Sequence, residues 1–284
     1  MKTAISFLCL MLVGLLHAGT ASSLGESTDV LTNSLGMKFV PVPGTKVKFC
    51  IWDVRVQDFE AFVKASGYDA TGSMYSFRIG IYDKLIYDKY GDTWQSPGFS
   101  QGPMHPVVGV NWNDAQAFCK WLSKKENKTY RLPTDAEWSV AVGLNESSGG
   151  TPKSKNGKVA GVYPWGTNWP PPSGAGNYAG SEVRSVKWPG LWKTIEGYRD
   201  DYICTSPVGS FTANQFGLYD MGGNVWQWCE DEYSSGSVTR LLRGGAWIVG
   251  NPARLLSSFR LDYYTDSRCD NFGFRCVCVV GSSR

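Results

Sequence analysis

The spacing of hydrophobic positions along the chain predicts three helices. The first spans residues 56–65, where one face carries Phe59, Phe62 and Val63 at helical spacing. The second follows Asn111, whose side chain can cap it, and its apolar face is made of Ala115, Phe118, Cys119 and Leu122. The third follows Thr134, which forms a capping box with Glu137.

Short apolar runs bounded by glycine and proline predict strands. One runs from His105 to the start of the second helix, and the others cover residues 33–42, 47–54, 218–221, 225–229, 241–248 and 273–280. Residues 68–104 and 144–215 show no regular period, so we expect them to be dominated by loops. No interior linker separates two hydrophobic cores. The pattern therefore predicts one α+β domain over residues 33–280.

The first residues of the chain predict export. Lys2 precedes an apolar run over residues 5–16, and small residues suited to signal-peptidase cleavage follow, which defines a signal peptide over residues 1–21. The apolar run is too short to anchor the chain in a bilayer. Residues 22–32 are polar, and we expect them to form a flexible leader. We therefore expect a secreted or periplasmic protein without a membrane anchor in its mature form.

Composition narrows the possible function classes. Of the 284 residues, 42% are hydrophobic and 19% are charged, which indicates a folded chain, and the net charge of +3 gives no reason to expect a nucleic-acid partner. The 12 Trp and 33 Gly indicate a core of large rings joined by turns. Removing Cys9 with the signal peptide leaves seven cysteines, for which disulfides are the expected state after export. Cys276 and Cys278 share one face of a strand, which favours two structural bridges over a redox centre.

Several motifs in a fixed order carry a resemblance to a known family. They include N-S-L-G-M-K-F-V from Asn33, R-L-P-T-D-A-E-W from Arg131, F-G-L-Y-D-M-G-G-N-V-W-Q-W from Phe216, L-R-G-G-A-W from Leu242 and G-F-R-C from Gly273. Together they resemble the formylglycine-generating enzyme (sulfatase-modifying factor) family over residues 33–280. The resemblance implies a single α+β domain with the formylglycine-generating-enzyme fold, which is related to the C-type lectin fold and poor in regular secondary structure.

The same resemblance implies a disulfide and bound calcium. The family joins the two cysteines that match Cys119 and Cys276. One calcium site would use Asn177, Tyr178, Asp200 and Tyr202, and a second would use Asp220, Gly223, Val225 and Gln227. Mixed carboxylate, amide and carbonyl oxygens suit Ca²⁺. Gln227 stands where the family has Glu, so we expect weaker binding at the second site. The alternative is that Asp200 is a solvated loop acid and Asp220 a turn cap.

The catalytic centre that the resemblance implies is absent from the sequence. The family's enzyme binds copper(I) through two cysteines just after an Arg-Gly-Gly-Ser segment, but no cysteine occurs here between Cys229 and Cys269. Val249 and a residue near Arg254 stand at those positions. His105 is the one histidine left after the signal peptide, so a three-histidine iron site is excluded, and we expect His105 to pack or hydrogen-bond. We expect no copper or haem and assign no catalytic residue.

The remaining candidates are binding residues. Aromatic and arginine side chains are common binding anchors, and five lie in or near the segments that line the family's substrate groove: Trp226, Arg243, Trp247, Arg254 and Arg260. The alternative is that the tryptophans are core residues, which is favoured for Trp226, and that the arginines form internal ion pairs. Two functions follow: a non-catalytic binding or structural module for a peptide, protein or glycan, or a diverged oxidoreductase in the same groove. The absent thiols favour the first.

Overall fold

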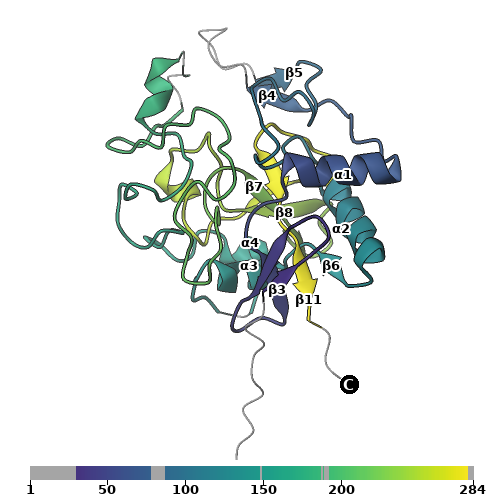
Figure 1. The fold of residues 1–284 in the computed structure, drawn as a ribbon. Helices are drawn as coiled ribbons and strands as arrows, with labels where there is room; N and C mark the ends of the chain where they lie inside the picture. The colour runs from purple at the N-terminus through teal and green to yellow at the C-terminus, as the bar shows by residue number, and fades with distance from the viewer. Residues whose placement is uncertain (1–29, 78–86, 148, 187, 189–191, 281–284) are drawn as a thin grey trace, which may run out of the picture.

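The computed structural model describes residues 30–77, 87–147, 149–186, 188 and 192–280. The predicted signal peptide and residues 22–29 of the predicted leader lie outside this part of the chain. Figure 1 shows helices α1 (Val56–Ser66) and α2 (Trp112–Glu126) along one flank, strands in the centre, and long loops on the opposite flank. No helix among the described residues is long and apolar enough to cross a membrane.

The three predicted helices are present, and their caps explain where they begin. Helix α2 starts after Asn111, whose side chain accepts a hydrogen bond from the Asp114 amide at 2.8 Å. Helix α3 (Asp135–Ala141) starts after Thr134, with the reciprocal capping box to Glu137. Each cap satisfies amide groups that the first helical turn leaves without a partner. Three shorter helices lie in the loops: α4 (Pro152–Lys155), η1 (Ser181–Ser185) and η2 (Pro252–Arg254).

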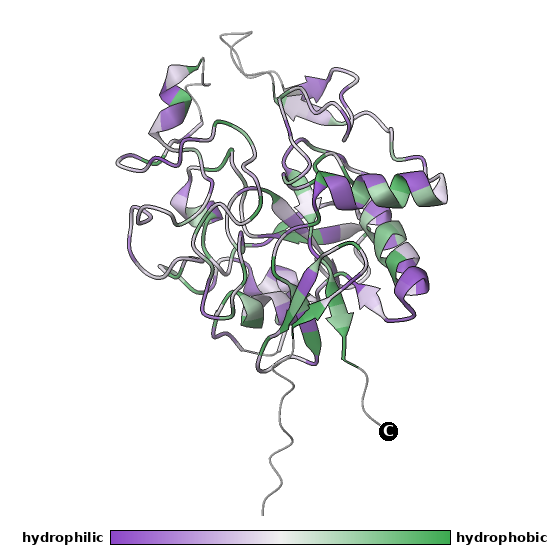
Figure 2. Ribbon diagram, in the orientation of Figure 1, coloured by the Kyte–Doolittle hydropathy of each residue, from purple (hydrophilic) through white to green (hydrophobic). Residues whose placement is uncertain are grey.

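The first sheet joins the two ends of the domain. Its strand order is β1 (Leu31–Thr32), β2 (Lys38–Pro41), β3 (Val47–Cys50), β11 (Val277–Val279) and β6 (Tyr130–Arg131), and every pair is antiparallel. Strand β1 corrects the expected leader, because residues 31 and 32 pair with β2 instead of remaining free. Figure 2 shows β11 as hydrophobic throughout, whereas α1 and α2 alternate between hydrophobic and hydrophilic positions.

The second sheet lies at the centre of the molecule (Figure 1). Its order is β10 (Phe272–Phe274), β7 (Trp226–Glu232), β8 (Thr239–Arg243) and β9 (Leu261–Tyr264), with β10 and β7 parallel and the other pairs antiparallel. A separate hairpin pairs β4 (Tyr75–Phe77) with β5 (Tyr87–Lys89). The described part of residues 144–215 contains α4 and η1 but no strand, in agreement with the expected loops.

Five expected strands are wrong or too long. Those over residues 33–42 and 47–54 are reduced to β2 and β3. Residues 218–221 form no strand, because Asp220 adopts a left-handed backbone with φ of 53° that no strand accepts. The run from His105 contributes only an isolated bridge between Arg55 and Pro106. The strand expected over residues 241–248 ends at Arg243, because the two glycines that follow have φ values of 97° and 82° and turn the chain.

The strand expected over residues 273–280 is two strands in different sheets. β10 pairs with β7, and β11 pairs with β3 and β6. Between them, Arg275 is fully buried, and its guanidinium donates hydrogen bonds to the carbonyl groups of Cys50 (3.0 Å) and Tyr219 (2.7 Å). This arginine therefore fixes the point at which the chain passes from one sheet to the other.

Candidate functional site

Arg243 and Arg260 are internal ion-pair partners and not groove residues. Both are buried, at 0% and 1% exposure, and both pair with Asp135 at the start of α3. Lys155 approaches the same carboxylate at 2.9 Å, and Arg260 also pairs with Glu146. The cations hold the pKa of Asp135 below its usual value against the opposing effect of burial. The expectation that these two arginines bind a ligand is corrected by their burial.

Trp247 is likewise a core residue. It is fully buried, and its ring centroid lies 5.8 Å from Phe99, 6.4 Å from Phe77 and 6.5 Å from Trp188. Its indole N–H donates to the carbonyl of Asp270 at 3.4 Å. A ring enclosed in this way cannot contact a ligand at the surface, so the expectation of a binding role for Trp247 is also corrected.

Arg254 lies at the mouth of a cavity of about 460 Å³ that we call the Arg254 cavity. The residues that line it include Trp192, Lys193, Trp226, Val249, Arg254, Tyr263 and Asn271. Trp226 is only 3% exposed, as the core interpretation favoured, but it still contributes to the wall. Val249, at a position matched to one of the family's copper ligands, and Arg254, near the position matched to the other, therefore line one cavity and bring no thiol to it.

Charge and hydrogen bonding set what the Arg254 cavity can hold. Arg254 and Lys193 are exposed, and none of the described residues lining the cavity is acidic. Asn271 is 6% exposed, and its Oδ1 atom is a buried acceptor without a hydrogen-bond partner in the described structure. Burial raises the pKa of Tyr263, and the positive charge of Arg254 opposes that shift. The cavity thus joins aromatic walls, two cations and one unused acceptor.

Gly250 brings two loops together at this cavity. A Cβ atom at Gly250 would lie 2.2 Å from the carbonyl oxygen of Lys193, so only glycine permits this close approach. The contact places Lys193 and Trp192 opposite the segment that carries Val249 and Arg254. No helical or strand period links residues 192 and 193 to residue 250, so Lys193, Tyr263 and Asn271 were not among the predicted site residues. The one sequence signal of this close approach between the two loops was the glycine at position 250.

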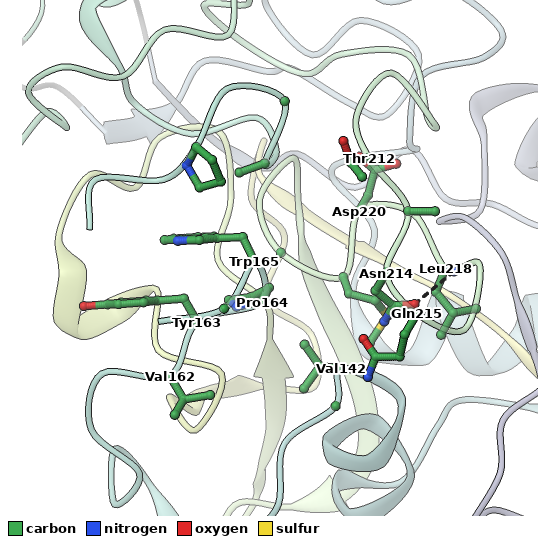
Figure 3. A pocket seen from close by; sticks show the side chains of 18 of the residues that line it. Val142, Val162, Tyr163, Pro164, Trp165, Thr212, Asn214, Gln215, Leu218 and Asp220 are labelled. Atoms are coloured by element: carbon green, nitrogen blue, oxygen red, sulfur yellow. Dashed lines mark hydrogen bonds between the residues drawn. The ribbon is translucent and has the colours of Figure 1, made fainter. Parts of the chain in front are cut away.

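A second cavity, of about 400 Å³, lies among the loops shown in Figure 3. The rings of Tyr163 and Trp165 are stacked at its edge, with centroids 4.9 Å apart and planes 1° apart. Two of its polar groups are used by the fold. Asn214 donates to the Ala141 carbonyl at 2.7 Å, and the indole of Trp165 donates to the Asn168 carbonyl at 2.9 Å. The Arg254 cavity carries two exposed cations in its described lining and is the stronger candidate for binding.

The first predicted calcium site gathers buried oxygen atoms. The carboxylate of Asp200 accepts hydrogen bonds from the amides of Tyr178 (2.7 Å) and Tyr202 (2.9 Å). Glu182, 4% exposed, lies beside Asp200 and accepts a hydrogen bond from the Asp200 amide at 3.4 Å. Asn177 is fully buried, and its Oδ1 has no hydrogen-bond partner in the described structure. The position of Glu182 was not expected from the sequence.

The electrostatics of this group fit a bound cation. Burial raises the pKa of Asp200 to about 7, and the negative charge of Glu182 contributes to the rise. Among the ion pairs of the described residues, neither carboxylate has a cationic partner. No cluster of three His, Cys, Asp or Glu side chains suited to a metal occurs in the described chain. A calcium ion here would therefore need amide and carbonyl oxygens, such as Asn177 Oδ1, beside the two acids.

The donors of the second predicted calcium site have other partners. Gln227 Oε1 accepts from the indole of Trp138 (3.0 Å) and from Nε of Arg275 (2.9 Å), and Gln227 Nε2 donates to the Asp220 carbonyl (2.7 Å). Both lone pairs of this amide oxygen are thus occupied, and the guanidinium would repel a cation. The residues do not fit a calcium ion bound by Asp220, Gly223, Val225 and Gln227.

No cysteine is among the described residues that line the Arg254 cavity. The thiols of Cys119 and Cys276 are buried and unbonded, with their sulfur atoms 3.6 Å apart, so their disulfide stays a prediction. Burial raises the pKa of Cys50 and Cys204 to about 12 and also raises that of Cys229. Thiols shifted in this direction are poor nucleophiles and poor metal ligands. His105 hydrogen-bonds Thr205 at 3.0 Å, as expected for a structural histidine.

Two small sheets, three principal helices, long loops and a cavity between loops define a protein of the formylglycine-generating-enzyme fold. Residues 34–280 match the sulfatase-modifying factor enzyme 1-like domain, and the chain belongs to this family. It is 29% identical over 262 residues to the inactive C-alpha-formylglycine-generating enzyme 2 of Bos taurus, covering 81% of this chain and 76% of that protein. It is 28% identical over 265 residues to the formylglycine-generating enzyme of Thermomonospora curvata, covering 79% of each. PvdO from Pseudomonas aeruginosa, 21% identical, shares the fold with a TM-score of 0.57 over 89% of this chain and 98% of its own.

Proposed function

We propose that this protein is an exported, non-catalytic member of the family that binds a peptide in the Arg254 cavity. One observation carries the proposal: Val249 stands at one position matched to the copper-binding cysteines, Arg254 stands near the other, and both line the cavity. A valine and an arginine cannot replace two thiolates as copper(I) ligands. The similarity to a protein named an inactive formylglycine-generating enzyme supports the same view.

The cavity has the features of a binding site. Its volume of about 460 Å³ lies in the range of ligand pockets, and its walls combine aromatic rings with a few polar groups. The segment from Arg243 to Arg254 supplies part of the wall. It begins at the buried, ion-paired Arg243 and contains the buried ring of Trp247, so the site is built on a fixed scaffold. We further propose that a calcium ion beside Asn177, Asp200 and Glu182 stabilises the loops of the opposite flank.

The proposal is tested by metal content and by turnover. Purified protein, loaded with copper(I) or iron(II) and then desalted, is expected to retain no stoichiometric redox metal. Incubation with a cysteine-containing sulfatase-motif peptide and oxygen is expected to leave the cysteine unchanged, as measured by mass spectrometry. Conversion of that cysteine to formylglycine, or one equivalent of copper per chain, would overturn the proposal and favour a diverged oxidoreductase.

A further inference from the structure

The Arg254 cavity has a charge pattern that selects its ligand. Its described lining carries two cations, Arg254 and Lys193, and no carboxylate. Both side chains are exposed, and among the ion pairs of the described residues neither has an acidic partner. The four buried arginines of the described chain behave differently, because each pairs with an aspartate: Arg55, Arg243, Arg260 and Arg275. The buried cations thus have acidic partners within the fold, whereas Arg254 and Lys193 have none among the described ion pairs and can pair with a ligand.

The position of Arg254 makes it available to a ligand. It ends the short helix η2, where its amide donates to the Asn251 carbonyl at 3.0 Å, so the backbone beneath the side chain is fixed. The side chain itself is exposed at the cavity mouth. A guanidinium offers a planar fork of donors that matches the two oxygens of a carboxylate. The geometry therefore suits an acidic group approaching from solvent.

The rest of the lining indicates a peptide as the carrier of that group. Apolar and aromatic side chains, including Trp192, Trp226, Ile248 and Leu261, make up much of the wall. Asn271 Oδ1 is a buried acceptor without a hydrogen-bond partner in the described structure. A peptide backbone has N–H donors at regular intervals that could bond to it. A sulfated glycan has few apolar surfaces and requires more than two cations along its length. The observations favour a peptide over a polyanionic glycan.

We propose that the Arg254 cavity binds an extended peptide segment through an aspartate or glutamate, whose carboxylate pairs with Arg254 and Lys193 while a backbone N–H is accepted by Asn271. This inference rests on the proposed function, because it names the ligand of the same cavity. It assigns a recognition role to Arg254, which lies near a position matched to a copper-binding cysteine of the family's enzyme.

The test begins with a library of random dodecapeptides displayed on phage and selected on the immobilised wild-type protein. Selected pools are expected to be enriched in Asp or Glu at one position. Peptides synthesised from the pool, each beside a version with the acid changed to its amide, are then titrated by fluorescence anisotropy. The amide version and the Arg254→Gln variant are each expected to bind roughly ten- to hundredfold more weakly, as for the loss of a hydrogen-bonded charge. Arg254→Lys keeps the charge but not the planar fork of donors, so its affinity for the peptide is expected to lie between those of the wild type and Arg254→Gln.

A matched control and separate outcomes keep the two proposals apart. Lys64→Gln removes a cation that is 71% exposed on α1, outside the cavity, and should leave affinity unchanged. Because Arg254 is exposed, its variants should have the same melting temperature as the wild type, and thermal unfolding checks this. Pools without acidic enrichment, or equal binding by Arg254→Gln, would overturn the acidic-peptide inference and leave peptide binding intact. Enrichment of no peptide, or binding of heparin but of no peptide, would overturn both.

Discussion

Replacing Asp135 by asparagine tests the buried ion-pair network on which the candidate site is built. Asp135 is 3% exposed and is the shared partner of Arg243, Arg260 and Lys155. Asparagine keeps the shape of the side chain but removes its charge, so three buried or nearly buried cations would face Glu146 alone. Each cation was desolvated on folding, and its compensation would be largely lost.

The expected loss of stability is large for a single atom exchanged. Removing one partner of a buried ion pair costs about 3–5 kcal/mol. For a domain of this size, a loss of that magnitude lowers the melting temperature by roughly 6–20 °C. Urea unfolding, followed by tryptophan fluorescence at pH 7, measures the free energy of unfolding directly. Asp135→Asn is expected to shift the midpoint strongly without changing the slope of the transition.

Two further variants make the result interpretable. Asp201→Asn removes a carboxylate that is 71% exposed and pairs with Arg199, and it should change stability by less than about 0.5 kcal/mol. If Asp135→Asn does not accumulate as folded protein, Ser139→Ala probes the same network, because Ser139 accepts from Arg243 (3.1 Å) and donates to Glu146 (2.6 Å). It should cost about 1–3 kcal/mol. A loss below about 1 kcal/mol for Asp135→Asn would refute the assignment of these arginines to the core.

Three other outcomes are expected. Because the folded pKa of Asp135 is lowered, its stabilising contribution is fully present above pH about 4 and is lost as the pH falls through the folded pKa, so the difference between wild type and Asp135→Asn in urea unfolding should shrink progressively below pH about 4. EGTA should lower the melting temperature of the wild type and Ca²⁺ should restore it, whereas Asp200→Asn should not respond; a wild type unmoved by chelator would contradict the calcium proposal. Under denaturing, non-reducing conditions Cys119 and Cys276 should escape alkylation, and reduction should destabilise the protein by about 4–5 kcal/mol; alkylation of both would exclude the disulfide.

Local signals predicted the helices, because the atoms that decide them are close in the sequence. The cap at Asn111 lies three residues from Asp114, whose amide donates to it, and the box at Thr134 involves Glu137. Strand ends were less predictable. The pair Gly244–Gly245 turns the chain after Arg243 although the apolar run continues, so hydrophobicity alone placed the strand end too late. Backbone dihedral angles, and not side-chain character, decide this boundary.

The candidate site was less predictable than the fold, since distant residues decide which side chains are buried. Arg243 and Arg260 resemble binding arginines in the sequence, but Asp135, more than 100 residues earlier in the chain, takes both. Arg254 differs in that its side chain is exposed and no acid pairs with it among the described ion pairs. Asn271 could not be selected at all, because its significance is an unsatisfied oxygen that only packing reveals.

The absence of the family's cysteine pair from an intact family fold has a physical explanation in these contacts. Trp247, with its ring cluster, and Arg243, with its aspartate, are buried side chains that stabilise this part of the domain. Val249 is also buried, at 6% exposure, and its apolar side chain packs in the core without a thiol. The side chain of Arg254 is exposed, so substitution there costs the fold little. The fold therefore does not depend on a thiol at either place, as the proposed charge-selective binding site requires.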